Sequence, residues 1–164
     1  MESTVNISLD FSGLEKIKLA CESLKSSIVR SGVFSEDPQV MEAAVLNELG
    51  GESEYEDGPF AGEKVLVPPR PFVSVPAERT APVALEKMAK SLFEDFKKEK
   101  IRESLAGVGS MIAEEQRKAL DTNGSNVPGW RQHNEPRTIA TKGFDKPLWS
   151  RRHETFPIKY EVIE

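Results

Sequence analysis

The chain has 164 residues, the usual size of one domain, with 30% charged and 38% hydrophobic residues. This balance predicts a modest core and much solvated or interface-forming surface, which suits an elongated or oligomeric protein better than a compact enzyme. The formal net charge of −5 argues against tight nucleic-acid binding, and the single cysteine, Cys21, excludes an intrachain disulfide and a cysteine-based zinc site.

Targeting and membrane signals are missing from the sequence. No apolar run approaches the roughly 18 residues of a membrane span, and the opening MESTVNISLDFSG lacks the basic start and apolar stretch of a signal peptide. We therefore expect no membrane association, and synthesis and folding in a reducing cytoplasm.

The N-terminal region predicts a strand, a helix and a second strand. Alternating apolar residues predict strands in TVNISLDFS (4–12) and SIVRSGVFS (27–35). Ser12 and Glu15 form a capping box that starts the helix, which we expect to end near Lys25. The apolar residues at helical spacing are Leu14, Ile17, Cys21, Leu24 and Ile28. On this stripe, Cys21 is expected to be a buried small hydrophobe.

A second helix is predicted from Asp37, as N-cap, and Pro38, in the first helical position. We expect it to end at Gly50-Gly51 and to bury the apolar stripe Met41, Ala44, Val45 and Leu49. The stretch 51–63 that follows predicts a flexible acidic loop. No Lys or Arg occurs between Arg30 and Lys64, although nine acids do.

A short strand, KVLV (64–67), leads into PPRPF, whose prolines hold the backbone extended. We expect Phe72 to insert beneath the long helices that follow and Arg70 to pair with a carboxylate. Direct contact of both side chains with a partner protein is the alternative.

Long helices are predicted from about Thr80 to Leu120. Their apolar stripes are Leu85, Met88, Leu92 and Phe96, and then Leu105, Val108, Ile112 and Leu120. Gly107 and Gly109 weaken the second helical pattern, which predicts either a break or a point of close packing.

The region 122–164 predicts an extended C-terminal arm with little helix and a closing strand in FPIKYEVI. It is also the most basic region, through Arg131, Arg137, Lys142, Lys146, Arg151 and Arg152. Taken together, the elements predict one α+β domain over 1–164: a small mixed sheet, a short N-terminal helix, long central helices and the arm.

Catalytic chemistry has little support in the sequence. His133 and His153 lie in polar, loop-like stretches with no recognisable spacing to further ligands, and the acidic loop lacks the order of an EF-hand. Phosphate-binding and nucleophile-elbow motifs are also missing. We expect no enzymatic activity, no cofactor and no metal site; a small hydrolase that uses one of the histidines with a carboxylate is the alternative.

Three segments, in order, resemble a family of small structural proteins of tailed bacteriophages. They are VMEAAVLNELGG (40–51), VLVPPRPFVSVPAE (65–78) and PRTIATKGFDKPLW (136–149), followed by IKYEVI (158–163). Members of this tail-completion, neck or head–tail joining family typically read A-x-x-N-E-F-G, I-P-P-R-P-F, and P-x-T-I-x-x-K-G-x-D-K-P-L-I-D-T-G. Here Leu49 replaces Phe, and Trp149, Ser150, Arg151 and Arg152 replace I-D-T-G.

The resemblance implies a structural protein of the virion, made in the host bacterial cytoplasm. It implies a ring, sixfold like the tail tube, that contacts neck, connector or tail proteins and lets genomic DNA pass without specific binding. The interface candidates are Asn47, Arg70, Phe72, Lys142, Phe144, Asp145, Leu148, Trp149, Arg151 and Arg152. The alternatives are a tail-terminator or connector-adaptor ring, and a cytoplasmic nucleic-acid-binding regulator that uses the basic arm.

Overall fold

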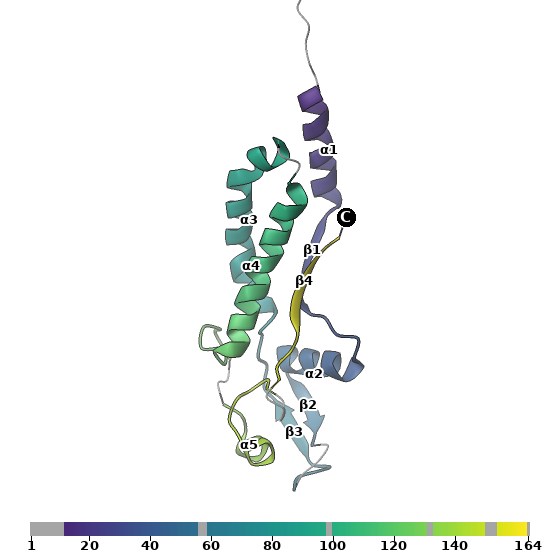
Figure 1. The fold of residues 1–164 in the computed structure, drawn as a ribbon. Coiled ribbons are helices and arrows are strands. Elements are labelled where there is room, and N and C mark those ends of the chain that lie inside the picture. The colour runs from purple at the N-terminus through teal and green to yellow at the C-terminus, as the bar shows by residue number, and fades with distance from the viewer. Residues whose placement is uncertain (1–11, 56–58, 98–99, 131–132, 150–153, 164) are drawn as a thin grey trace, which may run out of the picture.

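The computed structural model describes residues 12–55, 59–97, 100–130, 133–149 and 154–163 (Figure 1). Its elements, in chain order, are α1 (Ser12–Ser26), β1 (Ile28–Val33), α2 (Pro38–Leu49), β2 (Gly51–Glu54), β3 (Lys64–Val67), α3 (Ser74–Lys97), α4 (Ile101–Asp121), α5 (Pro136–Lys142) and β4 (Ile158–Ile163). The strand predicted over 4–12 falls outside the described residues except at its last position, and Arg151, Arg152 and His153 lie outside them entirely.

The α+β class is confirmed. The described strands form two separate antiparallel pairs, β1 with β4 and β2 with β3, rather than one mixed sheet. In the first pair Ile28 lies opposite Ile163 and Val33 opposite Ile158. In Figure 1 this ribbon runs alongside the α3–α4 hairpin, with α2, α5 and the β2–β3 hairpin at its lower end.

Helix α4 contributes more buried residues than any other described element. The predicted stripe of α4 is confirmed, because Leu105, Val108, Ile112 and Leu120 are all buried. The predicted stripe of α3 is wrong at Leu85, which is 53% exposed. There α3 instead packs Ala84 against Val108 and Ile112, because a small side chain lets the two helices approach closely.

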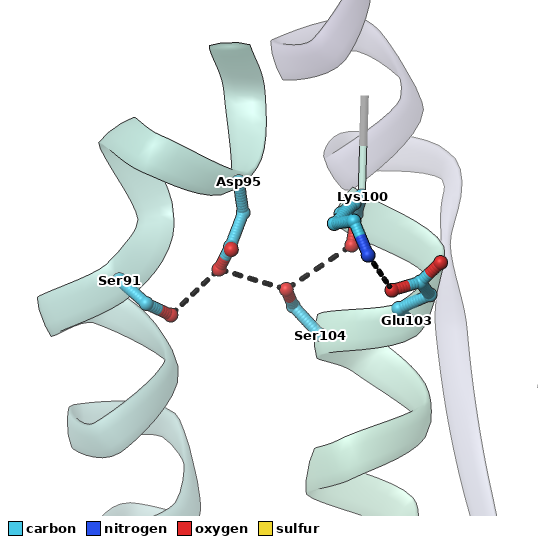
Figure 2. A network of polar contacts seen from close by, with 5 residues as sticks. All are labelled: Ser91, Asp95, Lys100, Glu103 and Ser104. Atoms are coloured by element: carbon cyan, nitrogen blue, oxygen red, sulfur yellow. Dashed lines mark hydrogen bonds and ion pairs between the residues drawn. The ribbon is translucent and has the colours of Figure 1, made fainter. Parts of the chain in front are cut away.

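The turn between α3 and α4 is held by a polar cluster (Figure 2). Asp95 Oδ2 accepts hydrogen bonds from Ser91 Oγ at 2.6 Å and from Ser104 Oγ at 2.9 Å, which joins the end of α3 to the first turn of α4. Lys100 Nζ donates to Glu103 Oε2 at 2.8 Å, and the hydrogen bond and charge of Glu103 raise the pKa of Lys100. These contacts fix the helix reversal.

Helix α4 lies against the β1–β4 ribbon at Gly109. A Cβ added there would lie 2.6 Å from Tyr160 Cδ2 and 3.1 Å from Val29 Cγ1, so the close packing predicted for this glycine is confirmed. The helix continues unbroken through Gly107 and Gly109. Two turns further on, the fully buried Gln116 accepts a hydrogen bond from Ser31 Oγ at 2.7 Å.

Two predicted apolar stripes are not buried as expected. In α1, Cys21 is exposed and Leu14 is 63% exposed, because this helix extends past the end of the hairpin (Figure 1). In α2 the only buried residue is Ala44, whereas Val45 is 52% and Leu49 72% exposed. The side of α2 that faces the protein is instead the one with Asn47 and the carboxylate of Glu48, both of which bind the chain that follows.

Two elements lie where none was expected. Residues 51–54, predicted as loop, form β2 and pair with β3, although alternating Gly, Glu, Ser and Glu give no hydrophobic signal. Within the arm, α5 begins with Pro136 in its first turn and ends at Gly143, whose left-handed backbone (φ 85°) forms its C-cap. Those two residues were the available signal for this short helix.

Candidate functional site

A groove of about 780 Å³ is the candidate site. Its walls come from α2, from β3 with the prolines after it, from α5 and the turn that follows, and from residues 154–157. The three segments 40–51, 65–78 and 136–149 therefore meet at one place. Of the predicted interface residues, Asn47, Arg70, Lys142, Leu148 and Trp149 line the groove.

Asn47 joins the first motif to the second. Its backbone carbonyl accepts from the Arg70 amide at 2.7 Å, and its Oδ1 accepts from Arg70 Nη1 at 3.2 Å. The Asn47 Nδ2 group donates in turn to the Ala43 carbonyl at 2.8 Å, which fixes the orientation of the amide. The guanidinium of Arg70, only 5% exposed as a residue, is thus held by an amide oxygen in the groove wall.

Glu48 holds the second motif at the start of α3. Its two carboxylate oxygens accept from the backbone amides of Val73 and Ser74, each at 2.9 Å. These amides have no acceptor within their own helix, and a carboxylate is also favoured by the helix dipole. This cap has no local signal in the sequence because its carboxylate comes from another helix. It stabilises the start of α3 at Ser74, ahead of the predicted start near Thr80.

Phe72 lies behind the groove wall. It is fully buried and stacks on Phe156, with ring centroids 5.2 Å apart and an interplanar angle of 11°. The predicted intrachain role is confirmed for this side chain, which is not available as a surface contact. Its partner Phe156 lines the groove, so the stack connects the groove to the core.

Lys142 is a titrating group of the groove whose pKa is strongly lowered. Burial, together with the nearby charge of Arg70, lowers its pKa to about 8, whereas Asp145 acts in the opposite direction. Its Nζ donates to the Lys146 carbonyl at 3.3 Å and lies 5.4 Å from the centre of the Phe144 ring. Arg70 and Lys142 therefore place two cationic groups on the same groove.

Asp145 fixes the turn that carries the third motif. It accepts from the Asn134 amide and from His133 Nδ1, both at 2.7 Å, and these contacts lower its pKa. The pairing of His133 with Asp145 was not predicted from the sequence. It lies in an exposed turn, with the His133 side chain 81% exposed.

Leu148 and Trp149 close the groove on the side of the arm. Leu148 has a left-handed backbone (φ 63°) that a branched side chain rarely adopts, and it packs against the core cluster. The Trp149 ring carries the Lys146 ammonium 3.3 Å from its centre. The interface candidates Leu148 and Trp149 thus pack partly within the chain and also line the groove, whereas Phe144 is not part of its lining.

Unsatisfied polar atoms surround the groove. Within the described part of the chain, Asn134 Nδ2, Trp149 Nε1 and Thr155 Oγ1 are buried without a hydrogen-bond partner. An unpaired buried polar group costs about 1–3 kcal/mol.

The other described features add no reactive constellation. No three His, Cys, Asp or Glu side chains among the described residues gather closely enough to hold a metal ion. None of the described helices is both long and apolar enough to cross a membrane. Comparisons with protein-family models, with curated proteins and with solved structures gave no match for this chain.

Proposed function

We propose that this protein is a structural subunit of a tailed-bacteriophage virion, forming a ring at the neck or at the head-proximal end of the tail. The observation that supports this most is the meeting of the three motif segments around one groove. Segments 40–51, 65–78 and 136–149 each supply groove residues, and Asn47 and Arg70 bind one another directly. A surface that binds neighbouring proteins would explain why the three motif segments occur together in one chain.

The mechanism in this proposal is assembly without a chemical step. Six copies would close around the tail axis, and the ring would offer a docking surface to neck, connector or tail proteins while genomic DNA passes through. Affinity would come from repeated contacts, with aromatic anchors surrounded by a polar rim. The groove fits this role because Trp149 and Phe156 lie beside Arg70 and Lys142.

A nucleic-acid-binding regulator is the alternative from a different class. It would depend on the basic arm, but Arg137 pairs with Glu63, Lys142 is half-buried, and Lys146 lies on an aromatic ring. These contacts favour a structural role for the described part of the arm. DNA affinity that fell steeply between about 50 and 200 mM salt would instead support the regulator.

The test is to look for the protein in purified phage particles and to image their head–tail region. We expect a six- or twelvefold ring at the neck or tail end, with residues 136–149 at a subunit boundary. A Trp149→Ala variant should lose incorporation, whereas Leu85→Ala, which truncates an exposed apolar side chain on α3 outside the groove, should keep it. Absence of the protein from particles would refute the proposal; a ring in another layer would select the terminator or adaptor alternative.

A further inference from the structure

Two helices present apolar side chains that the described part of the chain does not cover. On α1 these are Leu14 and Ile17, 63% and 38% exposed, with exposed Cys21 on the same side. On α2 they are Met41, Val45 and Leu49, which follow one another at i, i+4 and i+8 and so form one continuous stripe. Solvated apolar stripes of this kind mark contact surfaces.

The two stripes cannot cover each other within one molecule. Figure 1 shows α1 at the upper end of the β1–β4 ribbon, where it extends past the top of the α3–α4 hairpin and contacts α3 lower down, and α2 at the opposite end of the ribbon. Strand β1 and the segment after it hold them apart. A contact between them therefore requires two copies of the chain.

The charges beside the two stripes are opposite. On α1, Lys18 lies four residues after Leu14 and Lys25 four after Cys21, so exposed ammonium groups border the stripe on one side, with the exposed carboxylates of Glu15 and Glu22 further round the helix. On α2, the exposed carboxylate of Glu42 lies three residues before Val45 and on the same side.

The surroundings of α2 select the partner. Around α2 the exposed acids Glu36, Asp37 and Glu42 outnumber the one lysine that borders Met41, Lys159, so two α2 stripes packed together would bring mainly acids to acids. Like charges placed opposite each other disfavour such an isologous pair. A surface that carries lysines beside its apolar side chains is the matching one, and α1 provides it.

We propose that α1 of one copy packs on α2 of the next copy, head to tail. Such a heterologous contact uses two different surfaces of each chain, so it repeats from copy to copy and closes into a ring if the rotation allows. This contact rests on the proposed ring-forming function, because it names the two surfaces through which copies would meet. The ring could still form through other surfaces if this contact were absent.

The chain's single cysteine allows a direct test. The wild-type protein carries a thiol only on α1, and the double variant Cys21→Ser/Val45→Cys carries one only on α2. We expect mild oxidation of an equal mixture to give a disulfide-linked pair between the two proteins, whereas neither protein alone is cross-linked. The single variant Val45→Cys, which has both thiols, should give a ladder of dimers, trimers and larger species.

A charge exchange supplies the second measurement, read by sedimentation of the full chain. Lys18→Glu and Glu42→Lys should each raise the dissociation constant by about tenfold, and the double variant should recover most of the loss. Cross-linked dimers of the wild type alone, or of Cys21→Ser/Val45→Cys alone, would show an isologous contact and overturn the proposal. Rings that form without the mixed disulfide would overturn the α1–α2 contact and leave the ring-forming function intact. A chain that stays monomeric and is not cross-linked would overturn the α1–α2 contact and would also leave the ring-forming function without evidence of self-association.

Discussion

A methyl group added at Gly109 should destabilise the protein, although the same change usually stabilises a helix. Gly109→Ala places its Cβ 2.6 Å from Tyr160 Cδ2, 3.0 Å from Tyr160 Cγ and 3.1 Å from Val29 Cγ1. The Tyr160 Cγ atom can move away only through a change of the χ1 rotamer, and such a change would leave the crowding by Val29 Cγ1 in place. Relief therefore requires a shift between α4 and the β1–β4 ribbon.

The magnitude follows from two opposing terms. Overpacking a tight contact costs about 1–3 kcal/mol, whereas replacing glycine by alanine within a helix gains up to about 1 kcal/mol. The net loss at Gly109 should be up to about 2 kcal/mol. The matched control is Gly107→Ala on the same helix, where an added Cβ meets nothing within 4 Å and only the gain remains.

The assay is urea unfolding followed by far-UV circular dichroism, with both variants measured against the wild type. In urea, the free energy of unfolding of Gly107→Ala should exceed that of Gly109→Ala by about 1–3 kcal/mol. In thermal unfolding, each kcal/mol of this difference should separate the two melting temperatures by about 2–4 °C. A second substitution, Tyr160→Ala, should remove most of the penalty at Gly109. If Gly109→Ala matched Gly107→Ala in stability, the ribbon would not be rigidly packed on α4 and the reasoning would be refuted.

Three further predictions concern turns, caps and titration. Gly124→Ala should cost about 3 kcal/mol or more in denaturant unfolding, because its backbone is left-handed and the new Cβ would lie 1.9 Å from a buried indole; a loss below about 1 kcal/mol would contradict this. Glu48→Ala should cost about 1–2 kcal/mol by removing the α3 cap, whereas Glu42→Ala on the same helix should stay within about 0.5 kcal/mol; equal effects would exclude the cap. Lys142 should be acylated with a midpoint near its pKa of about 8, and Asp145→Asn should lower that midpoint; an ordinary lysine midpoint near 10.5 would show that the amine is solvated. Because the unfolded chain holds this proton up to the higher pKa, the contribution of Lys142 to stability should rise between about pH 8 and pH 10.5.

The parts of the fold that the sequence predicted well are those with local causes. Asp37 caps α2 by accepting from the Gln39 amide at 2.9 Å, as an acid before Pro38 indicates. The α4 stripe, the strand of 28–33 and the final strand also follow from short-range patterns. Each depends on neighbours within a few residues, which the sequence displays directly.

The sequence-based predictions that were wrong concern which part of the chain packs against a given helix or strand. An apolar stripe shows that a helix can bury one side, but it does not identify what covers that side, so Cys21 and Leu49 were placed in a core that does not reach them. Strand β2 was missed because its pairing with β3 comes from backbone hydrogen bonds and an exposed Glu52–Lys64 ion pair, and not from apolar side chains. In the groove, individual residues were predicted, but the Asn47–Arg70 bond and the Glu48 cap join parts of the chain more than twenty residues apart.

The pairing of β1 with β4 cannot form until almost the whole chain has been synthesised. Ser31 and Lys159, which are neighbours across the ribbon, are 128 residues apart in the sequence. At about 5–20 residues per second, β1 leaves the ribosome several seconds to tens of seconds before its partner exists. During that time the surface of α4 around Gly109 lacks the Tyr160 ring that covers it. A nascent or truncated chain without β4 would therefore expose this surface and an unpaired strand edge, so premature chains would be open to proteolysis and to mispairing with one another.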